Sequence, residues 1–499
     1  MKSLVVDLLN SFKRVIRPSA TLACLALSLG LLNVASISPL VTAATPNPPA
    51  ITAQYPGVYS SNTDPASATI AASPTQEMEL VNSKYMIANR SGVVSGKGAI
   101  NQLIGGGNVF LSDPQVMWDP QTSRFYFSLF ENAGTTTPDE GLVWGFSKTS
   151  TPSSATDFCS YFDTFNYGST SFPDRQSLGD TKNFLLIGSN RYSTSNETLM
   201  GSDVAWITKP PAGDTCPLAS SFGTGIQSLA NPDGSAPYTP TPARQVDNSS
   251  TGWILATPSY VSGNSLTLFN VTKNSSTGQA TISAPTSVPV ANYSYPPSAP
   301  QAGKTMSGNP APPLETRIYL TQAYMAYDPR IGQLALWTAH TIAGGAGSEV
   351  RWYEINPSNA TVDQYGTVSD PNLYVFNGTI APDRVVNGST AAFGNNAIIN
   401  VSTSSLTSYT AIQMATTING QPDSSLTMVQ QSTGSDVDYT CFDPSINTCR
   451  WGDYSGNTPD PGAPTNKAYG AVWSSNEWNV PDINDNTPVW RTIIWHSKP

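Results

Sequence analysis

A short motif recurs along this chain: a hydrophobic segment ends in Asp-Pro, a turn follows, and a second hydrophobic segment begins. The clearest copies are residues 115–130, with Asp119-Pro120, and residues 324–337, with Asp328-Pro329. This spacing predicts pairs of short antiparallel strands, joined by turns that Asp and Pro favour. Because weaker copies occur along most of the chain, we expect small sheets that repeat around one axis.

Helices are expected to be few. After residue 43, no segment of twelve or more residues shows a clear 3.6-residue period with caps, so the sequence predicts an all-β protein. Roughly 400 residues at about 40–50 per repeat predict a six- or seven-bladed β-propeller of antiparallel meanders. A pair of β-sandwiches is the alternative fold. No linker interrupts the middle of the chain, which favours a single propeller domain over residues 78–499.

The first 43 residues have the composition of a signal peptide. Basic residues come first, an apolar run covers residues 21–37, and small residues precede Ala43. We therefore expect cleavage near Ala43 and a secreted, extracellular protein. Residues 44–77 are rich in Pro, Ser and Thr and are predicted to be a linker. Later apolar segments are too short to cross a bilayer, so no membrane span is expected in the mature chain.

The chain is acidic, with a net charge of −10, and only 12% of its residues are charged. An acidic surface argues against nucleic acid as a partner, because phosphates need basic residues. The charged fraction is about half the usual ~25%. Ser, Thr, Asn, Gly and Pro take its place, which is typical of a loop-rich extracellular β protein. We expect a monomer.

Four of the five cysteines lie outside the leader: Cys159, Cys216, Cys441 and Cys449. An even number in an exported chain predicts two disulfides. Three pairings are possible, and proximity favours Cys441–Cys449 and, by default, Cys159–Cys216.

Five stretches together resemble a group of secreted bacterial β-propeller proteins, sialidase-like in architecture and mostly of unassigned function. These stretches are Asp113-Pro-Gln-Val, Trp118-Asp-Pro, Gly179-Asp-Thr-Lys, Arg450-Trp-Gly-Asp-Tyr-Ser and Trp490-Arg-Thr. The resemblance covers most of residues 105–499 and implies the fold and export. The chain lacks the Ser-x-Asp-x-Gly-x-Thr-Trp box and the Phe/Tyr-Arg-Ile-Pro stretch of true sialidases, so sialidase activity is not expected.

Asp113, Asp180 and Asp453 each precede a short apolar strand at a similar place in a module. If these strands line the central channel, the carboxylates converge and could divide acid and base roles, with Tyr454 and Arg450 assisting. The alternative, which we favour, is that each Asp caps a turn through backbone N–H groups.

Sugar-stacking aromatic residues and a metal site are weaker candidates. Trp478, expected in an exposed loop, and Trp451 are the predicted ligand-binding aromatic residues. Only two histidines occur, so a three-histidine zinc site is excluded. Calcium is the better candidate metal, with oxygen ligands from Asp482, Asn484 and Asn486, although a plain Asx-rich turn is the favoured interpretation of that stretch.

Two functions follow from these observations. The first is a secreted propeller that binds a glycan or another extracellular polymer. The second is an extracellular polysaccharide hydrolase or lyase that uses the channel-mouth carboxylates. A purely structural envelope protein is a third hypothesis.

Overall fold

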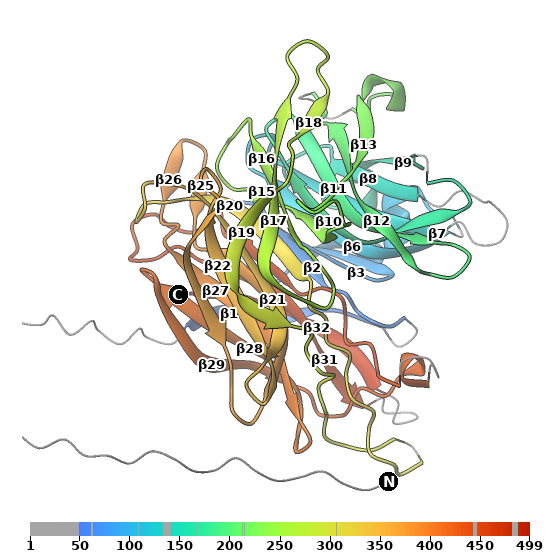
Figure 1. Ribbon diagram of the computed structural model, residues 1–499, viewed down its shortest axis with the longest axis vertical. Helices are drawn as coiled ribbons and strands as arrows, with labels where there is room; N and C mark the ends of the chain where they lie inside the picture. Colours follow the sequence, from blue (N-terminus) through green and yellow to red (C-terminus); the bar gives the residue numbers. More distant parts are fainter. Residues whose placement is uncertain are drawn as a thin grey trace, which may run out of the picture. The chain divides into compact units, whose positions relative to one another are not determined.

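The computed structural model describes residues 49–60, 63–107, 109–132, 141–165, 167–211, 213, 215–305, 307–442, 447–481 and 488–499. Within these residues, seven antiparallel sheets of four or more strands follow one another along the chain as the blades of a β-propeller (Figure 1). The prediction of an all-β propeller is confirmed, with seven blades. The predicted signal peptide lies outside the described residues.

The first three blades are regular four-stranded meanders. Blade 1 comprises β2 (Thr69–Ala72), β3 (Gln76–Val81), β4 (Lys84–Asn89) and β5 (Val94–Ala99). Blade 2 comprises β6 (Phe110–Asp119), β7 (Arg124–Asn132), β8 (Gly141–Ser147) and β9 (Phe158–Asp163). Blade 3 comprises β10 (Ser171–Asp180), β11 (Phe184–Ser193), β12 (Leu199–Thr208) and β13 (Thr224–Ser228).

The next three blades carry additions to this plan. Blade 4 comprises β14 (Tyr238–Pro242), β16 (Gly252–Thr257) and β17 (Ser262–Lys273), with β18 (Ala280–Ile282) and β19 (Thr286–Ser294) both paired to β17. Blade 5 comprises β20 (Leu320–Asp328), β21 (Gln333–Gly344), β22 (Gly347–Asn356) and β23 (Thr361–Val368), and β15 (Arg244–Gln245) pairs with β20 in parallel. Blade 6 comprises β24 (Tyr374–Pro382), β27 (Asn396–Ser405), β28 (Ser408–Ile418) and β29 (Gln421–Gln431), beside the hairpin of β25 (Val385–Asn387) and β26 (Thr390–Ala392).

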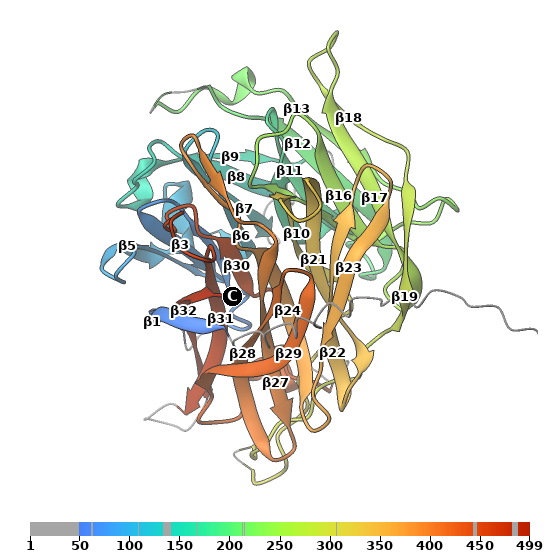
Figure 2. The same ribbon diagram turned by 90° about the vertical axis from the view of Figure 1, so that its left-hand side faces the viewer.

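The seventh blade closes the ring with strands from opposite ends of the sequence. It comprises β30 (Gly456–Pro459), β31 (Val472–Pro481), β32 (Pro488–Lys498) and β1 (Ala50–Ser60). Figure 2 shows the blue β1 alongside the red β32. The stretch expected to be a linker, 44–77, therefore holds β1 and β2 from Ala50 onward. Its proline-rich composition fits β1 because an edge strand tolerates Pro56, whose missing N–H would otherwise interrupt a ladder.

The core lies between neighbouring blades. Buried residues of β3, β4, β6 and β7 form one hydrophobic cluster, and residues of β7, β8, β11 and β12 form the next. A further cluster joins blade 7 to blade 1 through Trp473, Trp490, Ile70 and Met86. Each blade thus buries both of its faces, so its inner strands are apolar on both sides, as expected for packed sheets.

A β-bulge recurs near the start of the innermost strand. Pairing shifts register between Ser112 and Gln115 in β6, and between Asp174 and Ser177 in β10. Residues in the left-handed region lie at these bulges, including Asp113 (φ 53°) and Arg175 (φ 54°). Thr239 and Asn377 have the same conformation in blades 4 and 6. Because a bulge re-aims side chains, residues at equivalent places in different blades meet at one end of the channel, which we call the entry mouth.

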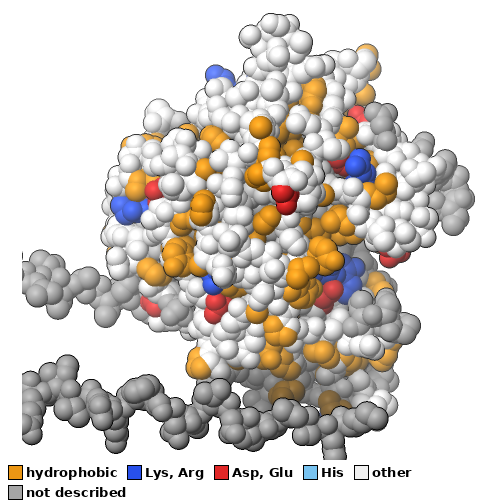
Figure 3. All heavy atoms as spheres, in the orientation of Figure 1, with side chains coloured by type: hydrophobic (Ala, Val, Ile, Leu, Met, Phe, Trp, Pro, Cys, Tyr) orange, Lys and Arg blue, Asp and Glu red, His pale blue; other side chains and the backbone are white. Residues whose placement is uncertain are grey.

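Both disulfides are present, Cys159–Cys216 and Cys441–Cys449, so the predicted pairing is confirmed. The helical segments are short 3-10 turns: η1 (Ile100–Ile104), η2 (Ala155–Asp157), η3 (Ala219–Ser221) and η4 (Tyr439–Phe442). No helix in the described part of the chain is long and apolar enough to cross a membrane. On the face in Figure 3, charged side chains are few and scattered, as the low charged fraction predicts.

Candidate functional site

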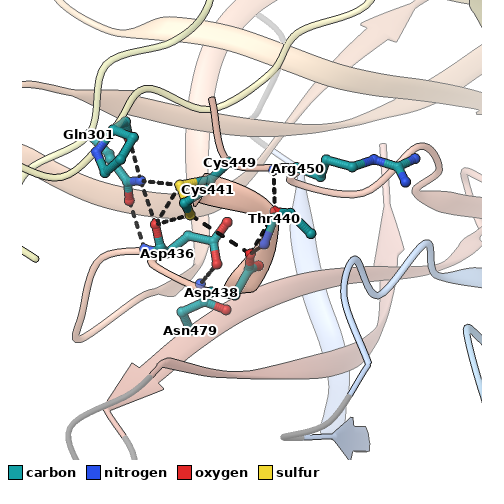
Figure 4. The surroundings of a disulfide bond; sticks show 9 residues. Gln301, Asp436, Asp438, Thr440, Cys441, Cys449, Arg450 and Asn479 are labelled. Carbon is teal, nitrogen blue, oxygen red and sulfur yellow. Dashed lines mark hydrogen bonds between the residues drawn. A yellow bond between two sulfur atoms is a disulfide. The ribbon is translucent and has the colours of Figure 1, made fainter. Parts of the chain in front are cut away.

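The Cys441–Cys449 disulfide loop positions the first residue of the candidate site, Arg450 (Figure 4). Backbone bonds join this loop to the segment that enters blade 5: Cys449 N donates to Pro313 O (2.9 Å), and Glu315 N donates to Cys449 O (2.8 Å). The Arg450 backbone N–H donates to Thr440 Oγ1 at 3.0 Å. This cross-link brings Arg450 beside Glu315, with 4.0 Å between Arg450 Nε and Glu315 Oε2.

At the entry mouth, eight side chains form what we call the arginine–aspartate cluster. Its members are Asp113, Asp174, Arg175, Arg317, Tyr319, Arg450, Asp453 and Tyr454. Asp453 is the centre: its carboxylate accepts from Arg450 Nη2 at 2.5 Å and from the Tyr319 hydroxyl at 2.7 Å. Four blades contribute, since Asp113 comes from β6, Arg175 from β10, Tyr319 from the entry to β20 and Asp453 from the entry to β30.

Arg175 connects the aspartates to the tyrosines. Its guanidinium stacks on Tyr319, lies 4.6 Å from the ring centroid of Tyr454, and donates from Nη2 to the Asp453 carbonyl at 2.9 Å. Its backbone N–H donates to Asp113 Oδ2 at 3.3 Å. A buried guanidinium between two aromatic faces is held in place by cation–π attraction and by packing.

The two central carboxyls differ in their protonation. Burial disfavours the charge on Asp453, but Arg450, Arg317 and Arg175 outweigh burial and hold its pKa well below the usual range. Burial, with Asp174 and Asp453 nearby, raises the pKa of Asp113 to about 7. Near neutral pH Asp453 is therefore ionised, and Asp113 is a carboxyl that is poised to give or take a proton; burial also raises the pKa of Asp174, the third carboxyl of the cluster.

Asp180 does not belong to this cluster. It lies at the far end of β10, where its carboxylate accepts from Lys209 Nζ (2.7 Å) and from the Gln245 backbone N–H (2.7 Å). Lys209 also bonds Asp119 Oδ2 at 2.7 Å. Asp383, which directly follows β24, similarly accepts from the backbone N–H of Gly394. Asp180 and Asp383 both accept backbone N–H groups, as a turn-capping residue does, but Asp180 is also ion-paired with Lys209.

The two aromatic residues predicted to bind a ligand, Trp451 and Trp478, pack against the interior of the protein. Trp451 is buried against the Cys441–Cys449 disulfide, and its indole N–H donates to Ser402 Oγ at 3.0 Å. Trp478 was expected in an exposed loop. It lies in β31 and packs, partly buried, against the core, because the strand continues through Asn479.

The predicted calcium ligands Asp482, Asn484 and Asn486 lie outside the described residues. Among the residues that the structure does describe, no group of three or more His, Cys, Asp or Glu side chains is arranged to hold a metal ion. His340 is fully buried between Ile318 O and the Tyr353 hydroxyl, and burial lowers its pKa to about 3. It is a neutral core residue.

The cluster opens to solvent through two of its arginines. The side chains of Arg317 and Arg450 are 33% and 37% exposed, whereas Arg175 is buried. A small hollow beside them is lined by Arg317, Tyr319, Thr321, Asn377 and Gly452, among others. Behind them, the buried Arg175 Nε and Nη1 and the buried Tyr454 hydroxyl have no hydrogen-bond partner within the described residues. Such an arrangement can receive an anion, and a planar carboxylate best matches a guanidinium.

Sequence reasoning therefore brought together Asp113, Arg450, Asp453 and Tyr454, and missed four members. Asp174, Arg175, Arg317 and Tyr319 carry no motif of their own. Part of the signal was available, because Asp113, Arg175 and Asp453 each lie five to seven positions before an aspartate that ends or follows an innermost strand. Arg317 and Tyr319 precede β20 in a loop whose path the sequence does not determine.

No protein-family profile matches this chain, and no characterised protein sequence matches it. Among solved structures, it is similar to the parainfluenza virus 5 hemagglutinin-neuraminidase ectodomain (10% identity, TM-score 0.38, 76% of this chain and 85% of that one). It is also similar to an exo-β-1,3-galactanase from Clostridium thermocellum (10% identity, TM-score 0.31, 63% of this chain and 65% of that one). A third similarity is to Trypanosoma rangeli sialidase (8% identity, TM-score 0.33, 86% of this chain and 58% of that one). At such TM-scores these similarities carry no argument about function, and the propeller assignment rests on strand pairing.

Proposed function

We propose that this protein is a secreted propeller that binds a carboxylate-bearing glycan at its entry mouth. The observation that carries the proposal is the convergence of three guanidiniums, two of them partly exposed, beside donors that lack partners. Asp453 accepts from Arg450 Nη2 through its carboxylate and from Arg175 Nη2 through its carbonyl, and Glu315 Oε2 lies 2.6 Å from Arg317 Nη2. The outer edges of Arg317 and Arg450 are therefore the groups that would meet the ligand carboxylate.

The test is calorimetric titration with glucuronate, galacturonate and N-acetylneuraminate, each against its neutral parent sugar. We expect at least one acid to bind and its neutral partner to bind at least tenfold more weakly, with affinity falling as salt rises, because the contact is a partly exposed ion pair. Arg317→Met should abolish this preference. Arg491→Met is the matched control, since Arg491 is an exposed arginine on β32. Equal binding of acids and neutral sugars would refute the proposal.

A second candidate function, glycoside hydrolysis, is favoured by one observation. Asp113, with a pKa of about 7, lies in the same cluster as ionised Asp453, and a protonated and an ionised carboxyl together are what acid–base cleavage of a glycosidic bond requires. Asp113→Asn separates the two functions. Binding that persists in this variant while sugar release disappears would indicate an enzyme. Intact sugar recovered from the native protein would leave the binding function.

A further inference from the structure

Five aromatic residues of blades 3 and 4 lie near one another, and we call them the tyrosine shelf: Phe172, Tyr192, Tyr238, Tyr260 and Tyr295. Phe172 and Tyr192 stack across β10 and β11 with 5.9 Å between ring centroids. The Tyr192 and Tyr238 hydroxyls are hydrogen-bonded, and Tyr238 lies 5.8 Å from Tyr260. The Tyr295 backbone N–H donates to Val261 O at 2.7 Å, which joins the last member to the turn that carries Tyr260.

The shelf begins at the arginine–aspartate cluster. The Tyr295 hydroxyl donates to Thr316 O at 2.9 Å, and Thr316 immediately precedes Arg317. Burial and Tyr238 raise the pKa of Tyr192, and the charges of Asp174 and Arg317 also act on it. On β10, Asp174 lies two residues from Phe172, which pairs with Tyr192, and Thr316 links Tyr295 to Arg317, so a ligand held at Arg317 would reach the shelf.

The outer part of the shelf is open. Tyr260 and Tyr295 are 55% and 44% exposed, and Val261 between them is 51% exposed. A row of exposed rings beside a charged hollow marks a binding surface more specifically than isolated exposed apolar residues do. Tyrosine suits sugars because its face packs against C–H groups while its hydroxyl remains available for hydrogen bonds.

We infer that the shelf binds neutral sugar units linked to the acidic sugar at the entry mouth, so that the ligand is an oligosaccharide rather than an isolated sugar acid. This inference rests on the proposed function. The shelf itself carries rings and hydroxyls, so the units over it are expected to be uncharged, whereas the carboxylate lies at Arg317.

The experiment compares each free sugar acid with a trisaccharide that joins it to two neutral sugars, such as glucuronosyl-xylobiose or sialyllactose. We expect the trisaccharide to bind at least tenfold more tightly. Tyr260→Ala should reduce that advantage to threefold or less and leave the affinity for the free acid unchanged. Tyr365→Ala is the matched control, because Tyr365 is 55% exposed, as Tyr260 is, but lies on β23 at the outer edge of blade 5.

The outcomes distinguish the inference from its premise. No binding of any acid, free or linked, overturns the proposed function and the inference with it. Equal affinity for the free sugar acid and for its trisaccharide overturns the inference and leaves the proposed function standing. A trisaccharide advantage that survives Tyr260→Ala, in a variant with native melting temperature, also overturns it.

Discussion

Glu79 lies at the seam where blade 1 meets the closing blade, and its replacement gives a sharp test of how this seam is held. Its fully buried carboxyl accepts from the Val58 backbone N–H of β1 at 3.0 Å and from the Ser475 hydroxyl of β31. Burial raises its pKa from 4.5 to about 7, against the opposing effect of these hydrogen bonds. One ionisable group thus touches strands from both ends of the chain.

The sign of the pH effect follows from linkage. Since the folded state holds the Glu79 proton more tightly than the unfolded chain, the neutral carboxyl is fully stabilising below about pH 4.5. This stabilisation is lost as the pH rises to about 7, and the loss is constant above that. At about 1.4 kcal/mol per pKa unit, ionising Glu79 in the native state costs roughly 3 kcal/mol.

Glu79→Gln removes the charge and keeps the shape. An amide oxygen can still accept from Val58 N–H, and the Ser475 hydroxyl can reverse to accept from the amide NH₂. We therefore expect the variant to match the native protein near pH 4.5 and to exceed its unfolding free energy by about 3 kcal/mol at pH 8.

Equilibrium urea unfolding between pH 4.5 and 8, followed by tryptophan fluorescence, measures this difference. At each pH the unfolding free energy of the native protein is subtracted from that of the variant, so that the contributions of the other buried carboxyls cancel. Glu197→Gln, at an exposed position, is the control and should give no pH-dependent difference. A constant difference between Glu79→Gln and the native protein across this range, or a variant less stable at pH 8, would refute the reasoning.

Two further substitutions test other parts of the fold. Lys209→Met leaves the buried carboxylates of Asp119 and Asp180 without their shared cation, so we expect a loss of about 3–5 kcal/mol in urea unfolding, and a loss under 1 kcal/mol would show that the pairing is unimportant. Replacing Cys159 and Cys216 by Ala releases a loop of 57 residues, for which chain entropy predicts a loss of about 4 kcal/mol. An unchanged urea midpoint would contradict that estimate.

The fold could be predicted because it depends on local repetition. Strand–Asp-Pro–strand units predict meanders, and the recurrence of weaker copies over roughly 400 residues favours a propeller of six or seven blades. The role of residues 50–60 could not be predicted, because a proline-containing edge strand resembles a linker until its partner, β32, is known.

The candidate site was predictable only where a motif marked it. Asp453, Tyr454 and Arg450 share one short stretch, and Asp113 begins another. Asp180 looked equivalent to Asp113 along the sequence, but it lies at the opposite end of its strand, where it bonds Lys209. The sequence pattern does not show that Asp113 lies at the bulge near the start of its strand whereas Asp180 lies at the strand's end. Arg317 and Tyr319 reach the site through a loop that the Cys449 backbone holds in place.

The pairing of β1 with β32 also determines how the molecule responds to force. The two strands are antiparallel, with Ala50 opposite Lys498, so the outer ends of both strands leave the ladder at the same edge. A pull on these ends loads the hydrogen bonds one at a time, beginning at Ala50, instead of all together in shear. The seam should therefore peel at low force in a single-molecule pulling experiment, and the remaining blades should rupture afterwards as separate, stronger events.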